Sequence, residues 1–170
     1  ISSWERFEAG ILVMRGFRSR AHRIHSSGDY RNPPPEGEHA RLHEYHVTRH
    51  IGPRIEIPKH LRARIGAAFV RKLMQQGCRV LAGAVDKRHA HFLTELPDDH
   101  REERAIVGKA KMISSYVVRD EMPGRIWAAG GRFKLIKNRA QHVATFKYVS
   151  KRQEKDAWVW TYREALPDEG

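Results

Sequence analysis

Residues 78–96 have the sequence CRVLAGAVDKRHAHFLTEL, and this stretch decides the fold that we expect. Cys78 to Val85 is a short apolar run of the kind that forms a buried strand. Asp86 to Arg88 is a short polar turn, and His89 to Leu96 then returns with frequent apolar side chains. We therefore predict a β-hairpin whose two strands are neighbours in a sheet.

Helical patterns flank this hairpin on both sides. Upstream, apolar residues recur at every fourth position from Leu61 to Leu73, which gives one apolar stripe. Downstream, an aspartate at 98–99 and Asn138 are suitable N-cap residues. The predicted helices cover 58–76, the stretch from 98–99 to about 121, and 138–153; the other predicted strands cover 45–49, 125–137 and 158–162.

The order of these elements is strand, helix, hairpin, helix, strand, helix. This order predicts an α+β fold in which helices pack on an antiparallel sheet. Residues 1–40 differ in composition, because they combine scattered arginines with Pro33-Pro34-Pro35, and we expect a basic arm or linker there. We place the compact domain at 41–163 and a tail at 164–170.

The chain is strongly basic, with a formal net charge of +12 and a sequence pI of about 10.3. Such an imbalance is typical of proteins that bind a polyanion, such as nucleic acid, a membrane surface or an acidic protein. A charged surface without such a partner is the alternative. No apolar run approaches the ~20 residues that a membrane span needs. Cys78 is the single cysteine, which excludes an internal disulfide and fits a reducing cytoplasm.

His89-Ala90-His91 lies in the second strand of the predicted hairpin. Because strand side chains alternate, both imidazoles point to one face, and Ala90 and Phe92 point to the other face, against the helices. Two neighbouring imidazoles can hold a divalent metal ion. The alternative is a pair of ordinary histidines on a half-buried strand, and the chain has 11 histidines in all.

Three blocks, in their order and spacing, resemble the HUH (His-hydrophobic-His) single-tyrosine transposases, near the REP-associated tyrosine transposases. Tyr45 to Thr48 resembles the opening strand of that family, and Asp86 to Leu93 resembles its metal-binding hairpin. Trp127 to Phe133, followed by Phe146 to Val149, resembles its tryptophan-led extended segment and the helix of its nucleophile. The resemblance covers about two thirds of the chain, from Tyr45 to about Trp160, and implies the ferredoxin-like fold of these enzymes.

By this resemblance, Tyr148 is the nucleophile of a single-stranded DNA endonuclease and strand transferase. It would attack a scissile phosphate, form a 5′-phosphotyrosine link and leave a free 3′-hydroxyl, and a second strand end would reverse the step. His89 and His91 would hold Mg²⁺ or Mn²⁺, which polarises the phosphoryl oxygens. Tyr116 is the second choice of nucleophile and Tyr162 the third.

The helix that carries Tyr148 has its own apolar pattern. At 100° per residue, Val143, Phe146 and Val149 share a face that we expect to be the core face. Tyr148 then lies nearly opposite that face, among cations. Without the resemblance, an ordinary surface tyrosine is the simpler interpretation.

The sequence departs from the family at one position. The family often has a third metal ligand four residues after its nucleophile, and Arg152 stands there. A guanidinium stays cationic and does not bind a metal. Three explanations stay open. The helix shifts its register so that Gln153 reaches the metal, Glu95 or Gln141 substitutes as ligand, or Arg152 holds phosphate in a weakened or repurposed enzyme.

Basic residues gather in the second half of the predicted domain, where each can contact phosphate. Trp127 and Phe133 either stack on unpaired bases or belong to the core. The expected partner is single-stranded or hairpin DNA, in a prokaryotic cytoplasm and near the nucleoid. Family members act as homodimers or as monomers. The alternative function is a catalytically silent nucleic-acid-binding protein on the same fold. The residues that we expect to contact DNA are Arg132, Lys134, Lys137, Arg139, Lys147, Lys151 and Arg152.

Overall fold

A computed structural model of the chain describes residues 9–15, 55–128 and 131–167. Five strands form one sheet in the order β4-β1-β3-β2-β5, and each neighbouring pair is antiparallel. The prediction of an α+β fold with an antiparallel sheet is confirmed. The elements in chain order are β1 Ala9–Arg15, α2 Lys59–Gln75, β2 Val80–Val85, β3 His89–Glu95, α3 His100–Tyr116, β4 Arg132–Leu135, α4 Arg139–Lys151 and β5 Trp158–Thr161.

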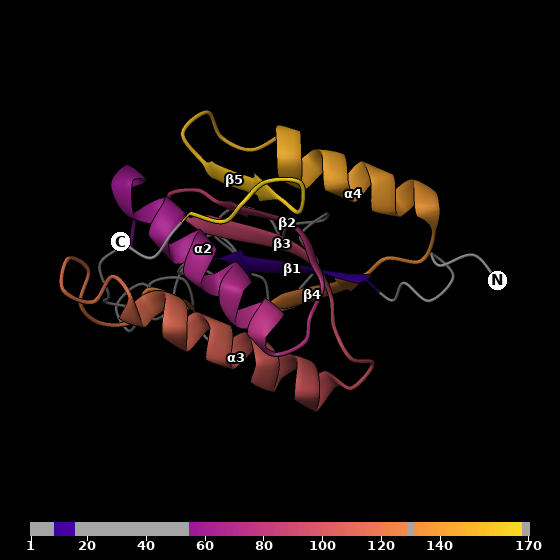
Figure 1. Cartoon of the computed structure of the whole chain (residues 1–170), viewed down its shortest axis with the longest axis horizontal. Helices are drawn as coiled ribbons and strands as arrows, with labels where there is room; N and C mark the ends of the chain where they lie inside the picture. The colour runs from indigo at the N-terminus through magenta and orange to yellow at the C-terminus, as the bar shows by residue number, and fades with distance from the viewer. Residues whose placement is uncertain (1–8, 16–54, 129–130, 168–170) are drawn as a thin grey trace, which may run out of the picture.

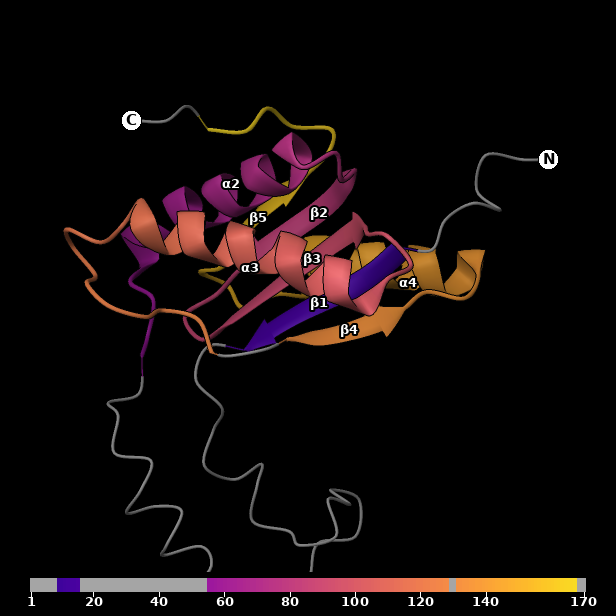
Figure 2. The ribbon, with the colours of Figure 1, turned by 90° about the horizontal axis from the view of Figure 1, so that it is seen from below.

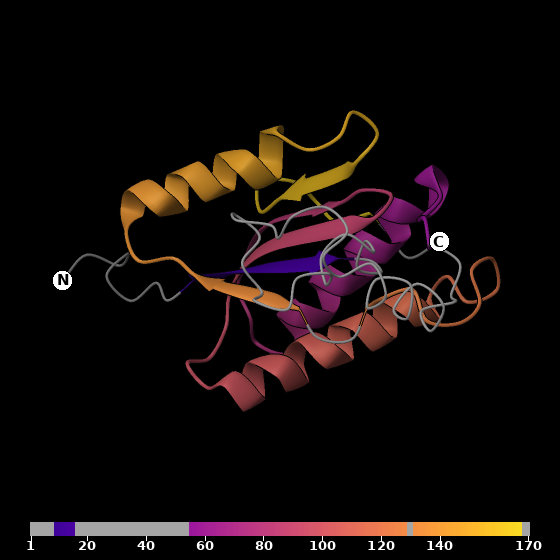
Figure 3. The same ribbon diagram turned by 180° about the vertical axis from the view of Figure 1, so that it is seen from behind.

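The helices lie on both faces of the sheet (Figure 1). Seen from below, α2 and α3 lie in front of the strands and α4 lies behind them (Figure 2). Seen from behind, β4 runs along one edge of the sheet into the segment that leads to α4 (Figure 3). The sheet therefore separates two helical layers, which we call the α2/α3 face and the α4 face.

The larger core fills the α2/α3 face. The predicted stripe of α2 from Leu61 to Leu73 is confirmed, since its four members are at most 1% exposed. Phe69 of this stripe stacks on Phe92 of β3 with ring centroids 4.2 Å apart. At Gly66, an added Cβ would lie 2.0 Å from the ring of Trp158, so the close approach of α2 to β5 requires a glycine.

A smaller core lies under α4. Its members come from the other face of β2 and β3, from the segment after β4, and from α4 itself. The small side chains of β2 leave room for the helix to approach the sheet. The buried residues are Leu81, Ala82, Ala84, Leu93, Ile136 and Val149, with Phe146 and Val159 packed against them.

Side-chain caps begin two of the helices as the sequence predicts. Asp99 accepts a hydrogen bond from the amide of Glu102 at 2.7 Å and begins α3. Asn138 accepts one from the amide of Gln141 at 2.9 Å and begins α4. Each cap satisfies an amide that the first helical turn leaves without a partner. The α3 helix ends at Tyr116, earlier than predicted, and only Arg132–Leu135 of the predicted strand 125–137 is a strand.

The N-terminal boundary of the compact domain was predicted wrongly. Ala9–Arg15, which we assigned to an arm, is β1, an inner strand between β3 and β4. An inner place in a sheet supplies partners for backbone amides and carbonyls on both sides, and this long-range gain is not visible in a local pattern. The predicted strand 45–49 lies outside the described residues.

The C-terminal boundary also differs from the prediction. Leu166 packs against the larger core, and Arg71 donates a hydrogen bond to the carbonyl of Pro167 at 2.7 Å. The chain therefore stays docked to residue 167, beyond the predicted domain end at 163. In the described part of the chain, no helix is both long enough and apolar enough to cross a membrane.

Candidate active site

The two histidines of β3 lie on the α4 face of the sheet. Their ring centroids are 6.4 Å apart and their planes differ by 27°. His91 is buried at 9% exposure, and His89 is partly exposed. Leu93, two residues on, belongs to the smaller core, whereas Ala90 and Phe92 belong to the larger one. Both imidazoles thus share a face as predicted, and α4 covers this face.

Asp86 holds the start of β3 in place. The carboxylate is buried and accepts hydrogen bonds from the amides of Arg88 at 2.6 Å and His89 at 2.5 Å. Its second oxygen lies 3.5 Å from Nδ1 of His89. Burial acts to raise the pKa of Asp86, but the hydrogen bonds from His89 and the two amides outweigh it, so the pKa is lowered. A carboxylate in this place orients the imidazole and leaves Nε2 facing away.

This role of Asp86 was not predicted from the sequence, which indicated only that the residue belongs to a turn. The available signal was its spacing of three residues from His89. At that spacing an aspartate accepts amide hydrogen bonds from the turn that follows it.

Tyr148 comes from α4 and meets the histidine pair. Its ring lies edge-on to His91, with centroids 5.4 Å apart and planes at 86°. The side chain is 43% exposed, so the phenol borders both the imidazole and the solvent. The structure thus brings together the three residues for which the sequence predicted catalytic and metal-binding roles.

The rotation of α4 differs from the prediction. Thr145 and Val149 are the buried residues of the helix, while Val143 is 43% exposed. Hydrophobicity alone favoured Val143, but Val149 is the valine of α4 that packs with Ala82 and Ala84 of β2. As a result Tyr148 lies at the margin of the buried face, beside β3, and not opposite it.

The suggested third metal ligands have other contacts or lie elsewhere. The Gln153 amide donates to the carbonyl of Tyr148 at 2.8 Å, just past the helix end. Gln141 accepts from the amide of Lys137 at 2.9 Å, about 10 Å along α4 from Tyr148 at 1.5 Å per residue. Glu95 lies about 13 Å along β3 from His91 and near Arg79. Among the described residues, no three His, Cys, Asp or Glu side chains group closely enough to hold a metal ion.

The donor set fits a metal ion in part. His89 and His91 can supply two neutral nitrogens on one side of an ion. Mg²⁺ and Mn²⁺ favour oxygen ligands, and Mg²⁺ usually keeps several waters. Oxygens from water or from a phosphate would therefore have to complete the coordination.

Two of the predicted DNA-binding cations share a face with the histidines. In the sheet register, Arg132 and His91 are both partners of Val13, and Lys134 and Leu93 are both partners of Ile11. Arg132 therefore stands on the α4 face, two strands or about 10 Å from His91. The other predicted contacts, on α4 or next to its ends, are Lys137, Arg139, Lys147, Lys151 and Arg152, and all are exposed.

The aromatic residues that were candidates for base stacking or for the nucleophile differ in burial. Trp127 is 3% exposed and donates through Nε1 to Ser114 at 2.8 Å, so it belongs to the core and does not stack on bases. Phe133 is partly buried on the α2/α3 face, with its ring edge-on to His100. Of the lower-ranked tyrosines, Tyr116 lies under the guanidinium of Arg119, and Tyr162 packs against Phe146.

Comparison with known proteins leaves the chain unassigned, because no protein family, no curated protein and no solved structure matches it. The resemblance to the HUH transposases therefore depends on the sequence blocks and stays a prediction.

Proposed function

We propose that this protein cuts and rejoins single-stranded DNA through a covalent link to Tyr148, as a transposase-like enzyme. The observation that carries the proposal is the edge-on contact between the Tyr148 ring and His91, on a face bordered by cations. A phenol, two imidazoles and several cations at one place are suited to phosphoryl transfer, which depends on positioning and charge stabilisation.

The order of elements supports the same family. The succession β1-α2-β2-β3-α3-β4 is the β-α-β-β-α-β order of ferredoxin-like folds. We propose that the protein has this fold, with α4 and β5 added to it. The addition of α4 carries Tyr148 to the face of the sheet that holds His89 and His91.

In the proposed reaction, the Tyr148 oxygen attacks the phosphorus of a phosphodiester. The new P–O bond to tyrosine forms as the bond to the 3′-oxygen breaks, so the phenol loses a proton and the 3′-oxygen gains one. A 3′-hydroxyl from another strand end reverses the step, with no external energy source. A phenol has a pKa near 10 and is a weak nucleophile at neutral pH, so its proton has to leave as the new bond forms.

The residues around Tyr148 position the reactants. The Asp86 carboxylate contacts both the backbone amide and the imidazole of His89. The packing of α4 holds Tyr148 beside His91. A divalent ion bound by His89 and His91 would withdraw charge from the phosphoryl oxygens. Arg132 and Lys134 offer phosphate contacts along the sheet edge.

The test is an incubation of the protein with labelled hairpin DNA that has single-stranded flanks, in the presence of Mg²⁺ or Mn²⁺. We expect a covalent adduct that survives denaturing electrophoresis with the wild type. Tyr148→Phe should abolish the adduct and retain DNA binding. Tyr162→Phe is the matched control, because Tyr162 is another exposed tyrosine near α4, and it should form the adduct normally.

A second candidate function is a DNA-binding protein that has lost catalysis. The observation that favours it is Arg152, an exposed cation at the position where the family often has its third ligand. Wild-type protein that binds hairpin DNA without any adduct supports this candidate. DNA cutting by Tyr148→Phe would contradict both, because it implies a water nucleophile.

A further inference from the structure

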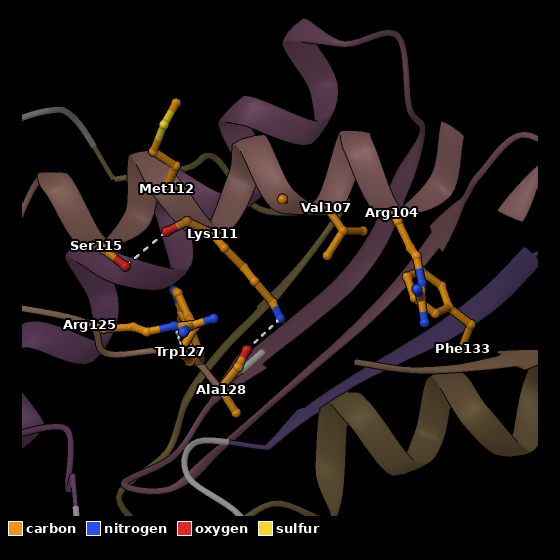
Figure 4. Close-up of a pocket in the computed structure, with 10 residues that line it drawn as sticks. Arg104, Val107, Lys111, Met112, Ser115, Arg125, Trp127, Ala128 and Phe133 are labelled. Carbon is orange, nitrogen blue, oxygen red and sulfur yellow. Dashed lines mark hydrogen bonds between the residues drawn. The ribbon is translucent and has the colours of Figure 1, made fainter. Parts of the chain in front are cut away.

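A hollow of about 610 Å³ opens beside α3, on the α2/α3 face of the sheet (Figure 4). Its volume lies in the range of small-ligand sites. The proposed DNA reaction does not use it, because Tyr148 and the histidines belong to the α4 face. The residues that define it are Arg104, Lys111 and Met112 of α3, Arg125 and Trp127 of the following segment, and Phe133 of β4.

The hollow is cationic. Of the described residues that line it, three are basic and none is acidic. The Lys111 ammonium donates to the carbonyl of Ala128 at 3.0 Å, and Nε of Arg125 donates to the carbonyl of Trp127 at 3.0 Å. These bonds hold both cations at the wall of the hollow, as Figure 4 shows. Burial, and then the charge of Arg125, lower the pKa of Lys111. A bound anion would oppose that effect.

The hollow also has apolar surface that a flat ring can contact. Met112 is exposed at its rim, and Phe133 is partly buried beside Arg104 (Figure 4). Gly108 lies between Arg104 and Met112 on α3, and a Cβ added there would meet no atom within 4 Å. Cations next to an aromatic ring match a phosphate joined to a base.

The β4 edge connects the hollow to the candidate active site. Successive side chains of a strand point to opposite faces, so Arg132 and Lys134 point to the α4 face and Phe133 to the hollow. Among the described strands, β4 pairs only with β1 and forms the edge of the sheet. A polyanion that follows the basic residues can therefore pass from one face to the other around this edge.

We propose that the hollow holds one nucleotide of the same DNA strand that is bound at Tyr148. A phosphate would lie by Lys111 and Arg125, and its base would contact Phe133 at the end of the hollow where Arg104 lies (Figure 4). This inference rests on the proposed function and adds a DNA contact on the opposite face of the sheet.

The test is DNA binding by fluorescence anisotropy, with a labelled hairpin that has single-stranded flanks, in the full-length Tyr148→Phe protein across a range of salt. Lys111→Ala should reduce the slope of log affinity against log salt by about 1. Gly108→Leu, which fills the hollow without changing charge, should weaken binding by about tenfold, the scale of one lost stacking contact. Thermal melting confirms that each variant is folded.

Lys109→Ala is the matched control, because Lys109 is an exposed lysine of the same helix that does not line the hollow. It should leave the affinity within about threefold of the parent, the scale of a weak surface contact. A loss as large as that of Lys111→Ala would overturn the inference. Unchanged DNA binding by Gly108→Leu would also overturn the inference. This applies even if free dTMP binds in the hollow, because the strand itself would then not bind there.

The two proposals fail separately. If the wild type forms no covalent adduct, yet Lys111→Ala and Gly108→Leu weaken binding, the nicking reaction fails and the hollow stands as a DNA contact. If the adduct forms and both variants bind DNA like the parent protein, the hollow fails and the nicking reaction stands.

Discussion

Among the described residues, one face of the sheet lies under two helices of 17 residues each, α2 and α3, whereas the other lies under one helix of 13 residues, α4. The α2/α3 face contains the larger core, with tightly packed rings such as Phe69 and Phe92. The α4 face contains a small core and leaves Tyr148 partly exposed. In the proposed reaction, this partial exposure gives a DNA strand access to the phenol of Tyr148.

The two faces of the sheet also differ in what constrains their residues. On the α2/α3 face, most positions serve packing and tolerate little change of volume. On the α4 face, His89, His91 and Tyr148 are not members of the smaller core. Variants on the two faces should therefore affect different measurements, stability for the first and activity for the second.

The largest expected effect is on the α4 face. His91→Ala should lower the rate of adduct formation by about a thousandfold, because the loss of metal-assisted charge stabilisation costs several kcal/mol. The measurement is the initial rate of covalent adduct formation with labelled hairpin DNA and Mn²⁺. His60→Ala is the control, since His60 is an exposed histidine of α2 outside both proposed DNA contacts and should leave the rate unchanged. Equal rates for His91→Ala and wild type would exclude the histidine pair from the reaction.

A pair of helix glycines tests packing on the α2/α3 face. Gly66→Ala should lower the free energy of unfolding by about 2 kcal/mol, because its Cβ would overlap the Trp158 ring. Gly108→Ala should raise it by about 1 kcal/mol, because the position is open and alanine favours a helix. Denaturant unfolding monitored by circular dichroism measures both. Opposite signs are the essential result, and a destabilising Gly108→Ala would mean that the hollow is not open.

The smallest expected effect concerns an exposed ion cluster that joins α2 to Glu121 in the segment after α3. Hydrogen bonds from His60 and from Arg64 lower the pKa of Glu121. A carboxyl whose folded-state pKa is depressed stabilises the fold above its unfolded pKa, near 4.3, and loses that contribution as the pH falls through the folded value.

Glu121→Gln tests this contribution. The variant should be slightly less stable than wild type at neutral pH, and the difference should shrink as the pH is lowered below 4. Melting temperatures measured across this range give the comparison. A difference that does not change with pH would show that the charge of Glu121 has no part in it.

Much of the fold followed from local sequence patterns. The hairpin at 78–96, the apolar stripe of α2 and the caps at Asp99 and Asn138 all depend on contacts within a few residues along the chain. The common face of His89 and His91 followed in the same way, because alternation along a strand is a property of the backbone.

Tertiary structure decided the rest. The insertion of Ala9–Arg15 as an inner strand, the rotation that lays Tyr148 beside His91, and the hollow beside α3 all join segments that are distant in the sequence. These features depend on which side chains can pack together, as Val149 does with Ala82 and Ala84 of β2. A single sequence determines local periodicity and side-chain chemistry, whereas the choice among long-range packings depends on the shapes of surfaces that exist only once the chain has folded.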